Sequence, residues 1–418
     1  MSEIMAELAE VKKASQQQTA ASQQIAGYHL EAVQKVENAS TSAIAKAEAS
    51  FNSKVTELTQ YSIEGHKKAI EDASGGKNTL LVDAQGNPNI MVRVQRFNYE
   101  DANAAILAKY GIDLQLGEGT PTMFMTNGVP RSEVLIAKYL ASSGKNGGCS
   151  VVGGAQPRTS VNYDQAKALC TAKGAGWHMM SIHEWAAIAI WALANGTVPR
   201  GNTNYGRSHE NKLETARRAD NGTPGDTSGT ARTDTGKGPD TWAHDHTAFG
   251  VQDLVGNVWE WLDQMMLKNG QIITTLDNDP SIAEANWHKH GAYFDSPSDS
   301  MEGTGSVGSP ILSNSVTKRN GPLDDDSYDY PSMSDSNWAG ITQSATYQKI
   351  ELLRRLLLES EVTNSVTGGI WARNYGNRMP LRGGHWYYGS GAGLGALILN
   401  YARSFSVSSF GFRPAFFV

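Results

Sequence analysis

Apolar side chains in the first 75 residues recur at the spacing of one helical face. They stand three or four residues apart, or at sums of these spacings, and resume in a shifted phase, at Ile4, Leu8, Val11, Ile25, Ala32, Val36 and Ala39, then Ile44, Phe51, Val55 and Leu58. This broken heptad pattern predicts a long helix. Because so narrow a stripe cannot build a core alone, we expect a parallel coiled-coil stalk over residues 1–75, and three chains suit a fibre better than two. A loosely helical, partly disordered leader is the alternative.

The pattern changes at Gly75 and Gly76, a double helix breaker. Residues 79–83 and 90–94 then read as two strands, joined by a turn at residues 85–88. We expect this hairpin, within residues 76–96, to form a β collar or linker between the stalk and a head.

Residues 97–418 have the mixed pattern of a globular head, so the predicted fold class is α+β. Apolar positions at helical spacing predict two helices, over 163–170 and around 185–192, on either side of a turn. Residues 201–240 and about 277–338 are loop-like, and an insertion spans about 263–378. A leucine-rich run predicts one strong helix over 347–360. The last forty residues read as short strands, with alternation at 404–407.

Charge and composition exclude several classes of protein. The chain has 418 residues and a formal net charge of −6 without a basic cluster, so we expect no nucleic-acid partner. The acidic N-terminus lacks a secretory signal and no run of 18 apolar residues occurs, so we expect a soluble chain made in the cytoplasm, without membrane insertion. Cys149 and Cys170 are too few for a disulfide scaffold; they either pair once or are two buried thiols.

Two histidine pairs are candidate metal ligands. His244 and His246 alternate along the chain, as do His288 and His290, and alternate residues of a strand face the same side. No third ligand can be named from the sequence, so we favour the alternative of solvated loop histidines.

Residues 253–261 read Asp-Leu-Val-Gly-Asn-Val-Trp-Glu-Trp, in which two tryptophans bracket Glu260 directly after a Gly-Asn turn. One interpretation is a tight turn entering a strand, with the carboxylate beside backbone carbonyls in an oxygen-rich calcium site. The alternative is that Glu260 accepts hydrogen bonds from buried backbone donors.

The segment 382–413 sets aromatic and hydroxyl side chains in a glycine-rich frame. From Trp386 to the C-terminus no further Lys, Glu, Gln, Met, Trp or Asp occurs. Tyr, His, Ser and Phe offer contact area and adaptable hydrogen bonds at low entropic cost, so this composition predicts a recognition surface.

Three motifs resemble the formylglycine-generating-enzyme type of C-type lectin fold. They are Gly-Asn-Val-Trp-Glu-Trp at 256–261, Leu-Arg-Gly-Gly-His-Trp at 381–386 and Gly-Phe-Arg at 411–413. Residues 161–170 and 183–186 resemble the helical portion of that family, so the resemblance covers roughly residues 150–418. It implies a head of this fold that follows the helical stalk along the chain.

The same resemblance bears on chemistry and on metal binding. The family includes enzymes that oxidise a cysteine with a cysteine pair in the C-terminal part of the domain, and this chain has no cysteine after Cys170, which excludes that reaction. Calcium sites in the family imply Asp253, Gly256, Val258 and Glu260 as ligands here, although Asp253 departs from the usual residue. No cofactor beyond this structural calcium is expected.

A narrower resemblance is to the variable proteins of diversity-generating retroelements, many of them phage tail receptor-binding proteins. The fixed frame of their C-terminal segment is kept at Arg382, Gly383, Gly384, Trp386, Gly389, Ser390, Ala392, Gly393, Ala396, Leu397, Leu399, Asn400, Ala402, Arg403, Ser404, Ser406, Gly411, Phe412 and Arg413. The replaceable positions, which the resemblance implies bind ligand, hold His385, Tyr387, Tyr388, Gly391, Ile398, Tyr401, Phe405, Val407, Ser408, Ser409 and Phe410. In such systems, as the resemblance implies, adenines are randomised, typically within Asn codons that end in C. Codons ending in C cannot specify Lys, Glu, Gln, Met or Trp, and none of these eleven residues is one of those five.

We expect different burial for different members of this segment. Trp386, Leu397, Leu399 and Phe412 are expected to pack inward. Tyr387, Tyr388, Tyr401 and Phe405 are expected to be exposed, because a lectin-type scaffold can change exposed side chains without repacking its core.

The resemblance implies a phage or prophage tail-fibre protein of the virion that binds a host-surface protein or glycan, rather than an enzyme. The stalk would form a homotrimer and attach to tail or baseplate proteins, and several copies would supply avidity. One rival is a metal-dependent oxidase on the same fold, with His244 and His246 as its candidate residues. The other is a variable ligand-binding protein of a bacterial surface.

Overall fold

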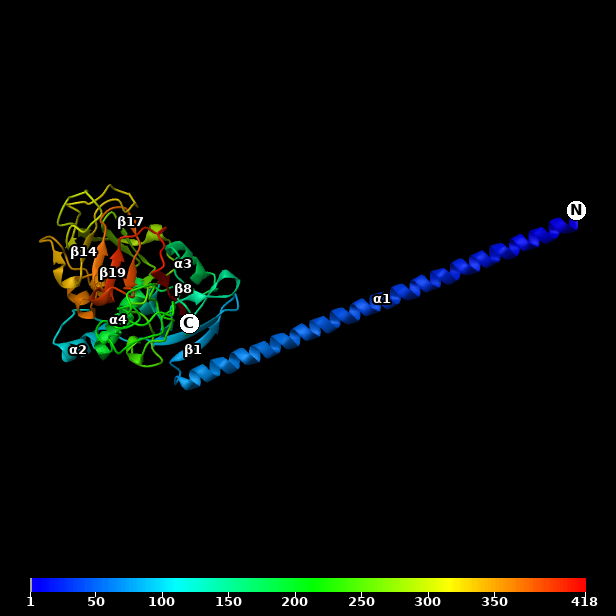
Figure 1. Cartoon of the computed structure of the whole chain (residues 1–418), viewed down its shortest axis with the longest axis horizontal. Coiled ribbons are helices and arrows are strands. Elements are labelled where there is room, and N and C mark those ends of the chain that lie inside the picture. Colours follow the sequence, from blue (N-terminus) through cyan, green and yellow to red (C-terminus); the bar gives the residue numbers. More distant parts are fainter. Residues whose placement is uncertain (1) are drawn as a thin grey trace. The chain divides into compact units, whose positions relative to one another are not determined.

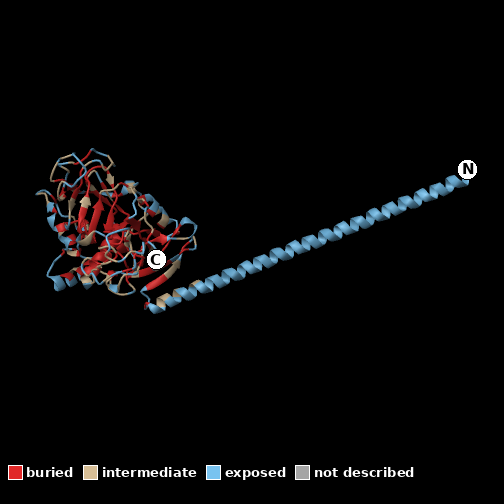
Figure 2. Cartoon of the chain, in the orientation of Figure 1, coloured by how far each residue is buried: buried red, intermediate tan, exposed pale blue. Residues whose placement is uncertain are grey.

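The computed structural model describes residues 2–418, which divide into two units after His66 (Figure 1). Helix α1 (Ser2–Ala73) has no buried residue, and its apolar side chains, such as Val11 at 67% exposure, are open to solvent (Figure 2). The helix ends where predicted, because Gly75 and Gly76 adopt positive φ and the Gly76 N–H donates to the carbonyl of Glu71. In residues 2–418 no helix is long and apolar enough to cross a membrane.

The second unit, residues 67–418, is called the head below. Its first sheet has the order β1-β2-β5-β21-β8, with β1 (Asn78–Val82), β2 (Pro88–Gln95), β5 (Glu133–Ala137), β8 (Trp177–Met179) and β21 (Pro414–Phe417). The predicted hairpin is therefore present as β1 and β2, and it is an integral part of a head sheet that also contains the last strand of the chain. Every pair in this sheet is antiparallel.

Both predicted helices of the head are confirmed. Helix α3 (Tyr163–Thr171) begins at the capping box of Asn162 and Gln165, and α4 (Ile182–Asn195) begins at the capping box of Ser181 and Glu184. Almost all of α4 is buried, and the indole N–H of Trp185 donates to the carbonyl of Leu394, 2.8 Å away. Helix α2 (Tyr99–Tyr110) packs beside α4.

The insertion contains more regular structure than its loop-like composition predicted. A second sheet has the order β15-β13-β12-β11-β10-β17, with β10 (Met265–Lys268), β11 (Gln271–Thr274), β12 (His288–Asp295), β13 (Ile311–Ser313), β15 (Thr342–Gln343) and β17 (Asn377–Arg378). Buried Ala292, Phe294 and Leu312 join it to the main core. Most of its strands are short, and long polar loops flank β12, so local periodicity did not reveal this sheet.

The third sheet carries the three family motifs. Its order is β14-β16-β19-β18-β9-β20, with β14 (Met333–Asp335), β16 (Ile370–Ala372), β19 (Gly393–Leu399), β18 (Leu381–Gly383), β9 (Trp259–Trp261) and β20 (Phe410–Phe412). Four two-residue strands pair outside these sheets: β3 (Met125–Thr126), β4 (Val129–Pro130), β6 (Ser142–Ser143) and β7 (Cys149–Ser150).

Two local predictions were wrong. The single helix expected over 347–360 is replaced by α5 (Glu351–Arg355) and α6 (Ser360–Thr363), because Leu357 adopts φ 56° and the chain folds around the buried Glu359. The carboxylate of Glu359 accepts from the Tyr347 hydroxyl and the Ile350 N–H, both at 2.9 Å. Residues 404–407 form a loop rather than a strand, and their alternation reflects Phe405 alone turning inward.

Candidate ligand-binding face

Strand β9 turns two tryptophans to one side of the third sheet and a carboxylate to the other. Trp259 and Trp261 belong to an apolar cluster with Leu381, Ile398 and Phe410 from the three neighbouring strands β18, β19 and β20. Successive residues of a strand face opposite sides, so this cluster defines one apolar face of the sheet.

Glu260, on the opposite side, forms a fully buried ion pair with Arg413. Its two carboxylate oxygens each accept from the guanidinium at 2.9 Å, and Arg413 also donates to the carbonyls of Ala137 and Gln252. The arrangement links the Trp-Glu-Trp and Gly-Phe-Arg motifs directly.

This ion pair does not fit the calcium site that the resemblance implied at Asp253, Gly256, Val258 and Glu260. Arg413 occupies both oxygens that a cation would need from Glu260, and the carboxylate of Asp253 accepts from the Gly236 N–H at 2.8 Å instead. Within residues 2–418 no cluster of three or more His, Cys, Asp or Glu side chains could hold a metal ion.

The end of β18 depends on a buried arginine, Arg382, and on Gly383. Arg382 is fully buried without a carboxylate and donates to the carbonyls of Leu356, Leu357 and Gly395, and burial lowers its pKa to about 9. Gly383 has φ 96°, and a Cβ there would lie 2.5 Å from the carbonyl oxygen of Leu254, so no other residue fits.

A tight turn then gathers the first replaceable aromatics. The ring of His385 lies 4.0 Å from that of Tyr387 and 4.5 Å from that of Tyr388. Tyr387 stacks on Tyr205 from a distant loop, and Tyr388 packs edge-on against Trp259. Burial lowers the pKa of His385 to about 3 and raises the pKa of Tyr388, so both rings are neutral at physiological pH.

A second aromatic group lies on the loop between β19 and β20. Tyr401 stacks on Phe405 with 4.3 Å between ring centroids, and both contact Phe410. Tyr328, from the insertion, packs against Tyr401 and Phe405 at 5.6 and 5.1 Å.

The backbone of these loops is fastened to segments outside the replaceable positions. The carbonyls of Gly391, Tyr401, Val407 and Ser409 accept hydrogen bonds from the backbone N–H groups of Gly369, Met379, Ser160 and Trp259, respectively. The bonds are 2.8 to 3.1 Å long. Since they use no side chain of a replaceable residue, a change of side chain leaves them available.

Arg403, a frame residue, adds a side-chain clamp to the same loop. Its guanidinium donates to both oxygens of Asp164, on α3, and to both oxygens of Glu284, in the insertion. The Arg403 carbonyl accepts from the N–H of Tyr163. The frame thus ties the loop to two other parts of the head.

The replaceable residues differ in exposure. Tyr387, Val407 and Ser408 are exposed, and Tyr388, Tyr401 and Phe405 are half-buried. His385, Gly391, Ile398, Ser409 and Phe410 are buried in this single chain.

The burial expected for individual residues agrees with the structure in most cases. Trp386, Leu397, Leu399 and Phe412 are buried, as predicted. Tyr387 is 53% exposed, as predicted. Tyr388, Tyr401 and Phe405 were expected to be exposed and are half-buried, because they lean on Trp259, Phe410 and Tyr328.

Sequence reasoning missed Tyr205, Tyr328 and Trp371 as members of this face. Trp371, on β16, lies 5.1 Å from the ring of Tyr388. Tyr205 and Tyr328 come from segments far from the motifs, and Trp371 stands ten residues before the motif at 381–386. Nothing in their local sequence distinguishes them from core aromatics. Together with the six exposed and half-buried residues at the positions expected to vary, they form what we call the variable face.

The two cysteines, and the histidines of the rival oxidase interpretation, are buried or hydrogen-bonded within the head. Cys149 and Cys170 are buried and unbonded to each other, and burial raises the pKa of both thiols. His244 is buried with its pKa lowered to about 4 and accepts from the Val251 N–H, and a ring nitrogen of His246 lies 3.2 Å from the carbonyl of Val198.

A comparison with protein-family models identifies the fold of the head. Residues 128–313 match the FGE-sulfatase family, described as Sulfatase-modifying factor enzyme 1-like domain. The match confirms the predicted fold, an α+β head of the formylglycine-generating-enzyme type of C-type lectin behind a long N-terminal helix.

The chain also aligns with solved structures. One is Treponema denticola variable protein 1, at 12% identity over 81% of this chain and 98% of that chain, with a TM-score of 0.32. Others are the P3c and U1 variants of the Major Tropism Determinant, at 14% and 13% identity, with a TM-score of 0.27. In each of these two, the alignment covers 71% of this chain and 53% of the other, so the chain spans about half their length. Among curated proteins no match is found.

Proposed function

We propose that this chain is a phage or prophage tail-fibre receptor-binding protein whose FGE-sulfatase head binds a host-surface ligand through the variable face. In this proposal a retroelement diversifies the replaceable positions, and α1 forms a homotrimeric stalk that attaches the virion protein to the tail or baseplate. The ligand is a protein or a glycan on the host cell.

The anchoring of the loops is the observation that carries the proposal. Four carbonyls at replaceable positions are held by backbone donors of fixed segments, and Arg403 clamps the loop between β19 and β20 through Asp164 and Glu284. A binding site that must accept many side chains needs a backbone that does not depend on them.

The composition of the variable face supports binding rather than catalysis. Tyr387, Tyr388, Tyr401 and Phe405 offer rigid contact area, and Val407 and Ser408 add exposed positions beside them. Stacked and edge-on aromatic pairs hold these rings in defined positions, which lowers the entropy lost on binding.

The test uses labelled full-length protein and a panel of bacterial strains, from which a strain that retains the protein is chosen. A variant with Tyr387→Ala, Val407→Ala and Ser408→Ala changes only exposed side chains. We expect unchanged thermal unfolding and loss of cell binding. Tyr110→Ala, at a 43% exposed tyrosine on α2, is the matched control and should bind normally.

Normal binding of the triple variant would refute the assignment of the variable face. The diversification claim has its own test. The DNA beside the gene should contain a reverse transcriptase gene and a near-copy of the 3′ end that differs only at adenines.

A further inference from the structure

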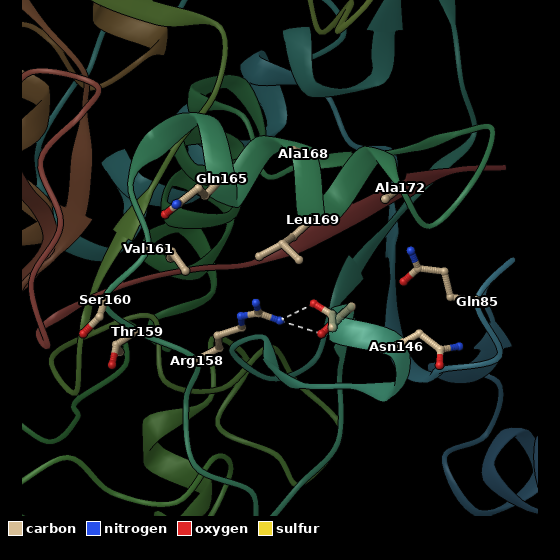
Figure 3. A pocket seen from close by; sticks show the side chains of 12 residues that line it. Gln85, Asn146, Arg158, Thr159, Ser160, Val161, Gln165, Ala168, Leu169 and Ala172 are labelled. Atoms are coloured by element: carbon tan, nitrogen blue, oxygen red, sulfur yellow. Dashed lines mark hydrogen bonds between the residues drawn. The ribbon is translucent and has the colours of Figure 1, made fainter.

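A cavity of about 590 Å³ lies on the head between α3 and the loops around Asn146 and Arg158 (Figure 3). It adjoins the loop between β19 and β20, whose Val407 carbonyl accepts from the Ser160 N–H. Its lining consists of residues outside the replaceable positions, namely Gln85, Asn146, Gly147, Gly148, Arg158, Thr159, Ser160, Val161, Gln165, Ala168, Leu169 and Ala172. The volume lies in the range of small-molecule sites.

One wall of this α3 pocket is an unpartnered face of the helix. Gln165 and Leu169 stand four residues apart, as do Ala168 and Ala172, so these residues share a face, and all but the half-buried Leu169 are exposed. Two alanines leave room above the helix, and Leu169 points toward the guanidinium of Arg158 on the facing wall (Figure 3).

Arg158 is the one charged side chain among the lining residues. Its Nη1 donates to the carbonyls of Gly147 and Gly148, at 2.9 and 2.6 Å. Within residues 2–418, Nε and Nη2 have no hydrogen-bond partner and no carboxylate forms a salt bridge with Arg158. A guanidinium edge left open in a pocket suits the two oxygens of a carboxylate.

The remaining polar groups suit hydroxyls rather than a second charge. The amides of Gln85, Asn146 and Gln165 can each donate and accept, as the hydroxyl of Ser160 can. A polyhydroxylated ring needs such paired donors and acceptors around it, while its C–H face tolerates the apolar wall of α3.

The pocket adjoins the variable face through the backbone. The Ser160 N–H donates to the carbonyl of Val407 at 3.1 Å, and Arg232 donates both to the hydroxyl of Thr159 and to the carbonyl of Ser408. A ligand held at Val407 and Ser408 therefore has a neighbouring residue of its chain within reach of the α3 pocket.

We propose that the α3 pocket is a fixed subsite for an acidic sugar, a saccharide unit bearing a carboxylate, which Arg158 pairs while the amides bind its hydroxyls. The inference rests on the proposed function, because it names part of the ligand that the variable face recognises. A fixed subsite beside variable positions would supply a constant share of the affinity, whatever the replaceable residues are.

The experiment measures binding of glucuronate to the full chain by saturation-transfer NMR, with glucose and the methyl ester of glucuronic acid as neutral counterparts. We expect glucuronate to bind about tenfold more tightly than either, the difference that a charge-assisted hydrogen bond supplies. Its affinity should fall as salt rises.

Two variants locate the binding. Ala168→Phe fills the pocket from an exposed helix position and should reduce glucuronate binding about tenfold or more. Thr171→Phe, on the same helix but outside the lining, is the control and should bind as the parent does. Arg158→Lys keeps the charge without the guanidinium edge and should lose most of the preference over the methyl ester.

Three outcomes would overturn the proposal: equal binding of glucuronate and glucose, no binding of either, or full glucuronate binding by Ala168→Phe. Stronger competition from a Glu-rich peptide than from glucuronate would also overturn it, in favour of a peptide subsite. These failures differ from failure of the proposed function, which appears as normal cell binding by the variant changed at Tyr387, Val407 and Ser408.

Discussion

Removing one partner of the Glu260–Arg413 ion pair should be among the most damaging single changes in the head. Both side chains are fully buried, and Arg413 donates two hydrogen bonds to Glu260 and one each to the carbonyls of Ala137 and Gln252. Arg413→Met leaves a buried carboxylate and two carbonyls without their donor. Breaking a buried pair in this way costs about 3–5 kcal/mol of unfolding free energy.

Urea unfolding followed by tryptophan fluorescence measures this loss, since Trp259 and Trp261 flank Glu260. Glu260→Gln should cost a similar amount, because it leaves a buried guanidinium unpaired. The double variant should lose less than the sum of the two, by about 1–3 kcal/mol, because the two sites share one interaction. Lys349→Met, which breaks the exposed pair with Glu361, is the control and should cost at most about 1 kcal/mol.

Two results would refute this reasoning. Strict additivity of the two single variants would mean that the pair is not coupled. An increase in stability of the parent protein on adding calcium, reversed by a chelator, would mean that a cation rather than Arg413 neutralises Glu260.

Three further predictions concern the acid response, the thiols and the loop clamp. Burial lowers the pKa of His183 and His385 to about 3 and of His244 and His290 to about 4, so the folded head holds these rings neutral while the unfolded chain protonates them near pH 6.5. The free energy of unfolding should therefore be highest above pH 6.5 and should fall as the pH drops toward 4, by up to about 1.4 kcal/mol per pH unit for each ring. Urea titrations at several pH values would measure this fall, and an unfolding free energy that does not change with pH would contradict it. The buried Cys149 and Cys170 should resist a thiol reagent at pH 8 until urea is added, and rapid labelling of the native protein would contradict their burial. Arg403→Ala should raise hydrogen exchange in residues 400–409 and weaken ligand binding while leaving the exchange of α4 unchanged; equal protection in the two proteins would show that the clamp is dispensable.

The motifs allowed the head's fold to be predicted, because each one has a demanding physical role. Gly383 lies where only glycine fits, Arg413 neutralises Glu260, and Ser181 with Glu184 caps α4. Because few other residues can meet these requirements, the motif residues of this chain stand in the same order as in the family they resemble. The resemblance can therefore be recognised from a single sequence.

The insertion and the leucine-rich run could not be predicted, because long-range contacts decide their structure. The run at residues 352–358 matches a helix by spacing, but Glu359 collects donors from Tyr347 and Ile350 and the chain turns at Leu357. Strand β12 pairs with β11 and β13 across long loops, and the local periodicity of the sequence does not indicate that pairing.

The sequence named candidate binding positions but not how deeply each one is buried. The replaceable positions were named from the C-terminal frame, whereas their burial depends on Trp259, Trp371 and Tyr328, which reach the site from elsewhere in the fold. The α3 pocket had no sequence signal at all, because its walls come from three separate segments.

The uneven burial of the replaceable positions has a consequence for how this head can evolve. A new side chain at Ile398 or Phe410 must pack into the cluster around Trp261, so whether the head still folds is the first constraint on it. A new side chain at Tyr387, Val407 or Ser408 meets solvent, so it is judged only by what it binds. Random replacement of the whole segment would therefore encode far more sequences than the number that fold. Most of the variety among the folded variants would lie at a few outward-facing positions.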